Sequence, residues 1–202
     1  GLISPILSPF DDNLSFNDEM YKVLAEDLLS SGCAGLAPFG TTGEALSLSN
    51  AERINALEYL IKSGIPANKL IPGTGLCNFP DTVNLCRNAI EMGCHGVMTL
   101  PAFYYKGVTD SGLFEYFKRL IDEINDPNLK IYLYHIPQVS GVSLSIDLVN
   151  LVAHQPTFGT RPFDESKRVT SPFNKPNPFT FPFADSLPYS IRICIPKHIP
   201  KP

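Results

Sequence analysis

The 202-residue sequence lacks any apolar run long enough to cross a membrane. A transmembrane helix needs about 20 consecutive apolar residues, and no stretch approaches that length. The first residues, Gly1 to Pro5, also lack the basic region and long apolar segment of a secretory signal. We therefore expect no membrane partner and a cytoplasmic location.

The sequence also lacks a basic field. It has 16 Lys and Arg against 20 Asp and Glu, a formal net charge of -4, and its basic residues are scattered along the chain. Binding a phosphate backbone requires clustered positive charge. We expect no nucleic acid partner.

Paired cysteines and metal-ligand spacings are absent as well. The five cysteines form no C-x-x-C pair; they are Cys33, Cys77, Cys86, Cys94 and Cys194. The histidines share no ligand spacing with one another. We predict reduced, buried thiols, no metal site and no cofactor.

Strand-like and helix-like patterns alternate about five times between residues 2 and 152, at intervals of roughly 30 residues. This is the pattern of βαβ units and a parallel sheet, so we predict an α/β fold. Periodicity favours a closed (β/α)8 barrel only slightly over an open, flavodoxin-like sheet. The expected strands are 2–10, 34–39, 69–75, 96–100 and 129–134, and the expected helices are 17–31, 50–63, one from about 81, 113–124 and one capped by Ser145.

The composition changes after about Gln155. More than half of the 19 prolines lie beyond that point, and Gly159 is the last glycine. Each proline removes an amide donor and disfavours a helix at the preceding residue. We therefore divide the chain into 1–157, the N-terminal part of the barrel, and 158–202, a Pro/Phe-rich tail without barrel pattern. The tail is a natural Pro-rich extension, an unrelated fusion or the product of a changed reading frame.

Two segments after predicted strands carry groups suited to chemistry. Gly40-Thr41-Thr42-Gly43-Glu44 combines glycines, adjacent hydroxyls and free N–H groups, which suit a small carboxylate or phosphate. It could also be a simple turn. Tyr134 ends the fifth predicted strand, where its hydroxyl could transfer protons or merely reach solvent from the edge of the core.

A third segment, 100–107, follows the fourth predicted strand with the sequence LPAFYYKG. Its adjacent tyrosines are typical of an interface. We expect Lys106 to be a solvated surface charge.

The three segments GTTGE at 40–44, LPAFYYKG at 100–107 and YHIPQVSGV at 134–142 resemble, in that order, the dihydrodipicolinate synthase and N-acetylneuraminate lyase family. The resemblance covers residues 1–157. It implies a (β/α)8 TIM barrel, truncated here after about five βα units. The family consists of class I aldolases and lyases, in which a lysine on the sixth strand forms a Schiff base with pyruvate or another 2-oxo acid.

The resemblance also implies roles for individual residues. Gly40, Thr41 and Thr42 would bind the substrate carboxylate, and the Thr41 hydroxyl would join a proton relay. Tyr134 would be the central acid/base group, and Tyr105 a relay tyrosine that serves a neighbouring subunit. The family implies a homo-oligomer, a dimer of dimers.

The chain departs from the family pattern at the nucleophile. Family members read G-I-K-D-S-S-G some 25 to 30 residues after the tyrosine, whereas residues 155–166 contain no lysine. Arg161 cannot replace it, because a guanidinium stays protonated. Lys167, the nearest amine, lies in the Pro-rich tail. We therefore expect the Schiff-base lysine to be missing and this chain to be inactive.

A second departure concerns the substrate. Val139 stands where dihydrodipicolinate synthases carry an arginine that pairs with a substrate carboxylate. The YHIP motif without that arginine resembles the neuraminate lyase and 2-keto-3-deoxy acid branches. The alternatives are 4-hydroxy-tetrahydrodipicolinate synthase and a non-catalytic pseudoenzyme or assembly subunit.

Overall fold

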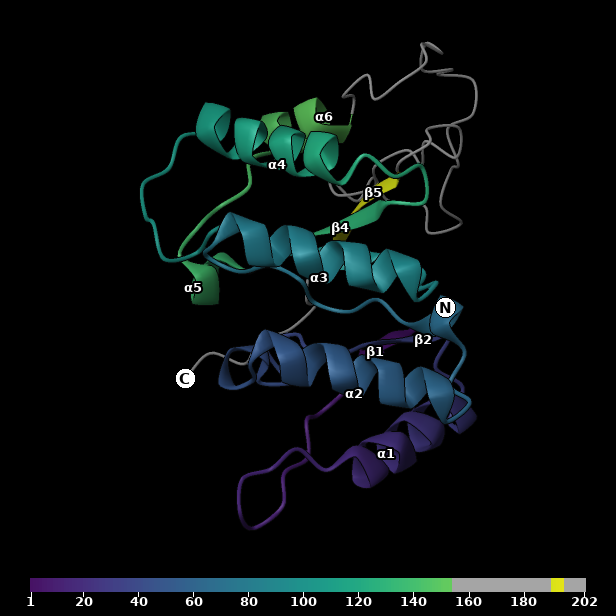
Figure 1. The fold of residues 1–202 in the computed structure, drawn as a ribbon. Coiled ribbons are helices and arrows are strands. Elements are labelled where there is room, and N and C mark those ends of the chain that lie inside the picture. Colours follow the sequence, from purple (N-terminus) through teal and green to yellow (C-terminus); the bar gives the residue numbers. More distant parts are fainter. Residues whose placement is uncertain (154–189, 195–202) are drawn as a thin grey trace, which may run out of the picture.

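Helices and strands alternate along the chain (Figure 1). The computed structural model describes residues 1–153 and the backbone of 190–194. The strands are β1 (Ile3–Pro5), β2 (Gly35–Ala37), β3 (Val97–Thr99), β4 (Lys130–Tyr134) and β5 (Ser190–Cys194). The helices are α1 (Asp18–Ser30), α2 (Asn50–Lys62), α3 (Phe79–Glu91), α4 (Asp110–Ile124), α5 (Pro137–Ser140) and α6 (Ile146–Ala153), with the 3-10 turns η1 (Ala45–Ser47) and η2 (Ala67–Lys69).

All strand pairs are parallel. β1 pairs with β2, β3 with β4, and β4 with β5. The strand expected at 69–75 was wrong as a continuous element, because it forms only two bridges, Leu36 to Leu70 and Gly73 to Met98. Pro72 is the physical reason, since it has no amide to donate to the ladder. These bridges connect the sheet of β1 and β2 to the sheet of β3, β4 and β5. Five extended segments, β1, β2, 69–75, β3 and β4, therefore lie side by side in sequence order, followed by β5.

The helices begin where side chains cap free amides. Asn17, Asn78 and Thr109 each accept a backbone N–H of the first turn, from Met20, Asp81 and Gly112 respectively. Ser49 and Glu52 form a reciprocal capping box at α2. Ser145 accepts the Leu148 amide at 3.0 Å, as expected for the cap of α6. The short helix α5 was not anticipated.

Helices α1, α2, α3 and α4 stack side by side along the strands (Figure 1). Their apolar faces build two core clusters, one between α1, α2 and the first strands, and one between α3, α4, α6 and the later strands. A third cluster lies on the other face of the sheet. It takes one side chain from each of four successive extended segments, namely Ala37, Ile71, Met98 and Tyr132. This arrangement matches a layer of side chains inside a barrel.

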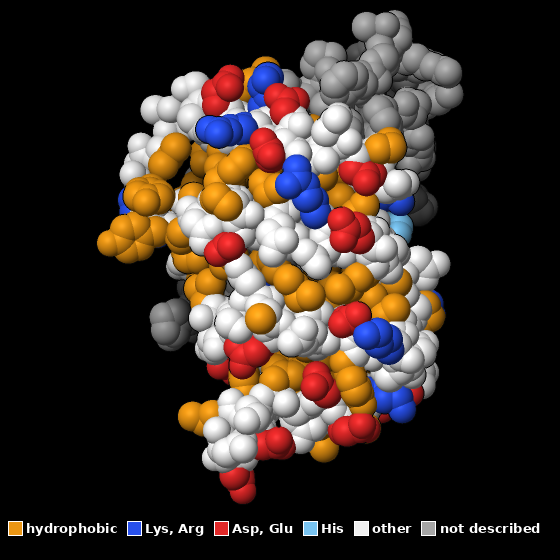
Figure 2. All heavy atoms as spheres, in the orientation of Figure 1, with side chains coloured by type: hydrophobic (Ala, Val, Ile, Leu, Met, Phe, Trp, Pro, Cys, Tyr) orange, Lys and Arg blue, Asp and Glu red, His pale blue; other side chains and the backbone are white. Residues whose placement is uncertain are grey.

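The surface over these helices carries charges of both signs. Figure 2 shows Lys and Arg interspersed with Asp and Glu rather than gathered into one patch. The longest helix among the described residues is α4, with 15 residues. No helix in this part of the chain is both long and apolar enough to span a bilayer. Most of the tail, 154–189 and 195–202, lies outside the described residues, so the expectation for 158–202 stays a prediction.

Candidate active site

Loops that follow successive strands meet at one end of the sheet and enclose a cavity of about 370 Å³. In a parallel α/β fold this carboxyl end is where ligands bind. The walls come from the segments after β2, after Pro72, after β3 and after β4. The lining residues are Phe39, Gly40, Thr41, Glu44, Ala45, Leu46, Ser47, Arg53, Gly73, Gly75, Met98, Leu100, Phe103, Tyr134, Val139 and Ser140.

Thr41 and Tyr134 come together in this cavity, 93 positions apart in the sequence. Their hydroxyl oxygens lie 3.2 Å apart, and either can donate. That distance is long for an O–H···O bond, as is common for catalytic groups without a substrate. Gly40 also lines the cavity, whereas Thr42 and Tyr105 are not among its lining residues. The structure therefore unites three of the five predicted site residues.

A side chain from the segment after β1 holds the 39–44 loop. The Ser8 hydroxyl donates to the Gly43 carbonyl at 2.6 Å. Phe39 and Glu44 have positive φ angles of 56° and 47°, so the loop turns sharply at both ends. Within the part of the chain that the structure describes, the amides of Thr41 and Thr42 donate no hydrogen bond. Unpaired amides beside hydroxyls suit a carboxylate.

His135, next to Tyr134, has a structural role. Its Nδ1 accepts the Leu144 amide at 3.2 Å, which places the ring proton on Nε2. Burial lowers the pKa of His135, since the charged ring is poorly solvated there. The neutral form thus holds the chain after α5.

This pKa shift predicts a pH dependence of stability. A histidine with a lowered folded-state pKa stabilises the fold above its unfolded pKa, near 6.5, and this contribution is lost as pH falls below that value. We expect the urea concentration at the midpoint of unfolding to decrease as the pH is lowered from 7 to 5. His135→Gln, which keeps an acceptor for Leu144, should flatten that slope. Urea unfolding at several pH values measures it, and equal slopes in both proteins would contradict the assignment.

The loop after β3 carries two exposed aromatic side chains directly after Phe103, which lines the cavity. Tyr104 is 75% exposed and Tyr105 60% exposed, and their rings meet edge to face at 5.5 Å. Lys106 is exposed, as expected, but its amine also donates to the carbonyls of Phe103 and Ser140. Lys106 therefore ties the loop after β3 to the loop after β4.

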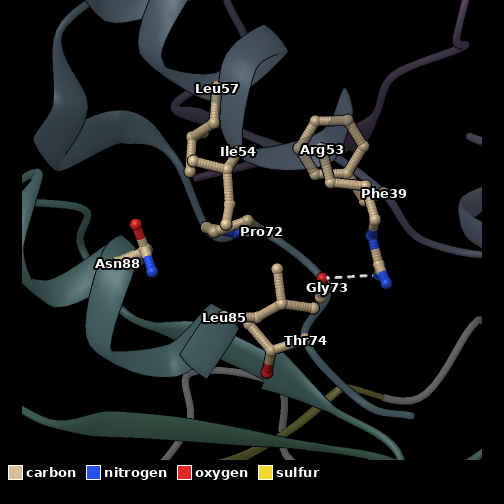
Figure 3. Close-up of a pocket in the computed structure, with 9 residues that line it drawn as sticks. All are labelled: Phe39, Arg53, Ile54, Leu57, Pro72, Gly73, Thr74, Leu85 and Asn88. Atoms are coloured by element: carbon tan, nitrogen blue, oxygen red, sulfur yellow. Dashed lines mark hydrogen bonds between the residues drawn. The ribbon is translucent and has the colours of Figure 1, made fainter. Parts of the chain in front are cut away.

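Arg53 is a charged cavity residue that the sequence analysis did not predict. It lies on α2 and is only 2% exposed. Its Nη2 donates to the Gly73 carbonyl at 2.9 Å (Figure 3), and its guanidinium carbon lies 5.9 Å from the centre of the Phe39 ring. Burial lowers its pKa to about 10. Helical spacing places Arg53 in one stripe with the apolar Leu57 and Leu60. This position on the apolar face of α2 is the sequence feature that indicates a buried arginine.

The cysteines differ in part from the prediction. Cys86 is fully buried, but Cys33, Cys77 and Cys94 are only half-buried, and all four are free thiols. Burial raises the pKa of Cys86 to about 11, which keeps it protonated. The Cys194 side chain lies outside the described residues. Among those residues, no three His, Cys, Asp or Glu side chains are grouped as metal ligands.

Comparison with known sequences identifies related proteins. Residues 1–159 match the sequence model of the Dihydrodipicolinate synthetase family. An uncharacterized DapA-like lyase of Chloroflexus aurantiacus is 35% identical over 161 residues, which cover 78% of this chain and 53% of that protein. The 4-hydroxy-tetrahydrodipicolinate synthase of Methanothrix thermoacetophila is 31% identical over 150 residues, which cover 74% of this chain and 48% of that protein. The chain thus spans about half the length of the curated relatives it matches.

Solved structures give the same picture. Dihydrodipicolinate synthase from Agrobacterium tumefaciens superposes with a TM-score of 0.71 at 30% identity, over 74% of this chain and 52% of that one. YagE, a prophage protein of E. coli solved with pyruvate, superposes with a TM-score of 0.66 at 27% identity, over 76% of this chain and 50% of that one. A variant of the 2-keto-3-deoxygluconate aldolase of Sulfolobus solfataricus superposes with a TM-score of 0.68 at 27% identity, over 75% of this chain and 50% of that one.

Proposed function

The chain belongs to the dihydrodipicolinate synthetase family, and we propose that its cavity binds pyruvate or another 2-oxo acid. Its fold is the first part of a (β/α)8 TIM barrel, covering about half of each related chain. The observation that carries the proposal is the Thr41–Tyr134 hydroxyl pair at 3.2 Å inside the cavity. The pyruvate complex of YagE supports the choice of ligand.

We assign the groups of the cavity as follows. The Thr41 hydroxyl and the amides of Thr41 and Thr42 receive the substrate carboxylate, with Gly40 allowing close backbone approach. Tyr134 moves a proton to or from the carbon skeleton of the bound oxo acid, with the Thr41 hydroxyl as its relay partner. In a complete family site a lysine would supply the iminium that stabilises the carbanion.

The substrate branch follows from Val139. This side chain lines the cavity and is 58% exposed, at the position where the family resemblance places a carboxylate-binding arginine. An apolar group there cannot pair with a second carboxylate. We therefore propose the 2-keto-3-deoxy acid or neuraminate lyase branch, for which the Sulfolobus aldolase is the structural parallel. The runner-up is 4-hydroxy-tetrahydrodipicolinate synthase, the name of several relatives.

We propose that this chain binds its ligand without forming a Schiff base. Residues 155–166 contain no lysine, and they lie outside the described residues. The exposed Tyr104 and Tyr105 on the loop after β3 support an assembly role through a homo-oligomer, for which the family implies a dimer of dimers. Such a subunit would hold a 2-oxo acid but leave the bond chemistry to other copies of the family.

Trapping with borohydride tests the proposal. We expect isothermal titration of the 202-residue chain to show pyruvate binding, and borohydride added with pyruvate to leave every lysine unmodified by mass spectrometry. The full-length Agrobacterium enzyme is the positive control for trapping. Light scattering on the same sample gives the oligomeric state.

Each outcome of this experiment decides a separate point. Absence of pyruvate binding would overturn the ligand. A reduced adduct on a lysine would overturn the proposed lack of Schiff-base chemistry. A monomer at the concentrations used for binding would overturn the assembly role.

A further inference from the structure

Arg53 is a buried positive charge without a negative partner among the described residues. The four ion pairs found there join other residues and are solvent-exposed. Arg53 itself is 2% exposed and touches the Gly73 carbonyl and the face of Phe39. A carbonyl dipole and an aromatic quadrupole offset part of the cost of burying a cation, but neither carries a net charge.

The guanidinium is also short of acceptors. Its Nη2 donates to Gly73, whereas Nε and Nη1 have no hydrogen-bond partner within the described part of the chain. The pKa of about 10 lies well above neutral, so the group remains charged at pH 7 despite its burial. The protein therefore keeps an uncompensated cation in place of an apolar side chain that would fit the same helical stripe.

This cation lies at the wall of the candidate site. Arg53, Thr41 and Tyr134 line one cavity. Figure 3 draws a second pocket that Arg53 also lines, and it shows the guanidinium beside Phe39 with its hydrogen bond to the Gly73 carbonyl; Phe39 and Gly73 line the candidate-site cavity as well. Glu44 lines the same cavity but forms no ion pair with Arg53. The enclosed guanidinium is shielded from salt, so its field reaches the cavity with little screening.

We propose that Arg53 is the counter-charge of the ligand and selects an anionic group, a carboxylate, over a neutral carbonyl compound. It acts through its field across the cavity wall, while Thr41 and Thr42 supply the hydrogen bonds. Arg53 is thus a specificity-determining residue rather than a catalytic one. The inference rests on the proposed function, because it takes the 2-oxo acid as the ligand.

Two ligands of nearly equal shape separate charge from packing. Pyruvate is an anion, and pyruvamide is its neutral amide. We expect the full 202-residue chain to bind pyruvate more tightly than pyruvamide. Arg53→Met should reduce that ratio of affinities by about tenfold or more, because a unit charge acts more strongly across a buried wall than through water, whereas Arg53→Lys should keep most of it. Arg87→Met, which removes an exposed arginine from α3, is the matched control for net charge and should leave the ratio unchanged.

The outcomes distinguish this inference from the proposed function. If Arg53→Met weakens both ligands equally and the ratio stays constant, Arg53 only supports the fold and the inference is overturned. If Arg53→Met does not fold, Arg53→Gln keeps a donor for the Gly73 carbonyl and gives the same neutral comparison against Arg53→Lys. If the unmodified chain binds neither ligand, the proposed function itself fails. If it binds both with a ratio that no Arg53 variant changes, only the counter-charge role fails.

Discussion

Gly73→Ala is expected to destabilise the fold by about 3 kcal/mol or more, because the added methyl group has no space. A Cβ at Gly73 would lie 2.1 Å from the Phe39 carbonyl oxygen and 2.9 Å from the Phe39 carbonyl carbon. Both contacts are to backbone, which cannot rotate away. The Gly73 amide also donates to the Pro38 carbonyl at 2.8 Å, so a shift of the segment would break the bridge between the two small sheets.

Thermal and urea unfolding followed by circular dichroism would measure this loss. A destabilisation of about 3 kcal/mol corresponds to a midpoint lower by roughly 6 to 12 °C for a domain of this size. Gly112→Ala in α4 is the matched control. Its Cβ would lie 3.1 Å from Val108 Cγ1, a side-chain atom that is free to move, and alanine favours a helix by up to about 1 kcal/mol. If both variants melted like the parent chain, the close approach at Gly73 would be disproved.

The succession of elements followed from the sequence because apolar periodicity is a local property. The helices 50–63 and 113–124 were predicted to within a few residues, and the structure adds that Ser49 and Thr109 cap them. The strands were predicted too long, since an apolar run records burial rather than pairing. At Pro72 the run continues, but the ladder loses a donor.

The site was predictable where it depends on strand ends. Thr41 follows β2 and Tyr134 ends β4, and the carboxyl ends of the parallel strands in the two bridged sheets face the same side. Arg53 could not be assigned this way, because its role depends on how α2 packs over Phe39 and Gly73. The link from Lys106 to the Ser140 carbonyl likewise joins two loops whose separation no periodicity encodes.

Arg53 also illustrates why a buried charge is a clue to function. Replacing a buried ion by an apolar side chain of similar size is often neutral or stabilising. Leu57 and Leu60, on the same face of α2, show that the helix accommodates apolar groups there. A cation retained among them, beside a cavity, costs stability that a bound anion would offset.

Thr41→Val is expected to weaken pyruvate binding by about tenfold or more, since a hydrogen bond to a charged group contributes about 1.5–3 kcal/mol. Valine keeps the branched shape and removes only the hydroxyl. Thr41 is exposed, so the unfolding midpoint should not change. Tyr134→Phe should have a smaller effect on binding, because it removes a neutral hydroxyl whose contact with Thr41 is 3.2 Å long. Titration with pyruvate measures both.

The ranking of the variants locates the carboxylate. Thr42 is exposed and does not line the cavity, so Thr42→Val should cost less affinity than Thr41→Val. If Thr42→Val costs more, the carboxylate lies on the outer side of the loop and the field of Arg53 has less influence on it. If the affinity lost in the double variant equals the sum of the losses in Thr41→Val and Tyr134→Phe, the two hydroxyls act independently and the proposed relay is wrong. Non-additive losses are expected, because each hydroxyl orients the other toward the bound oxo acid.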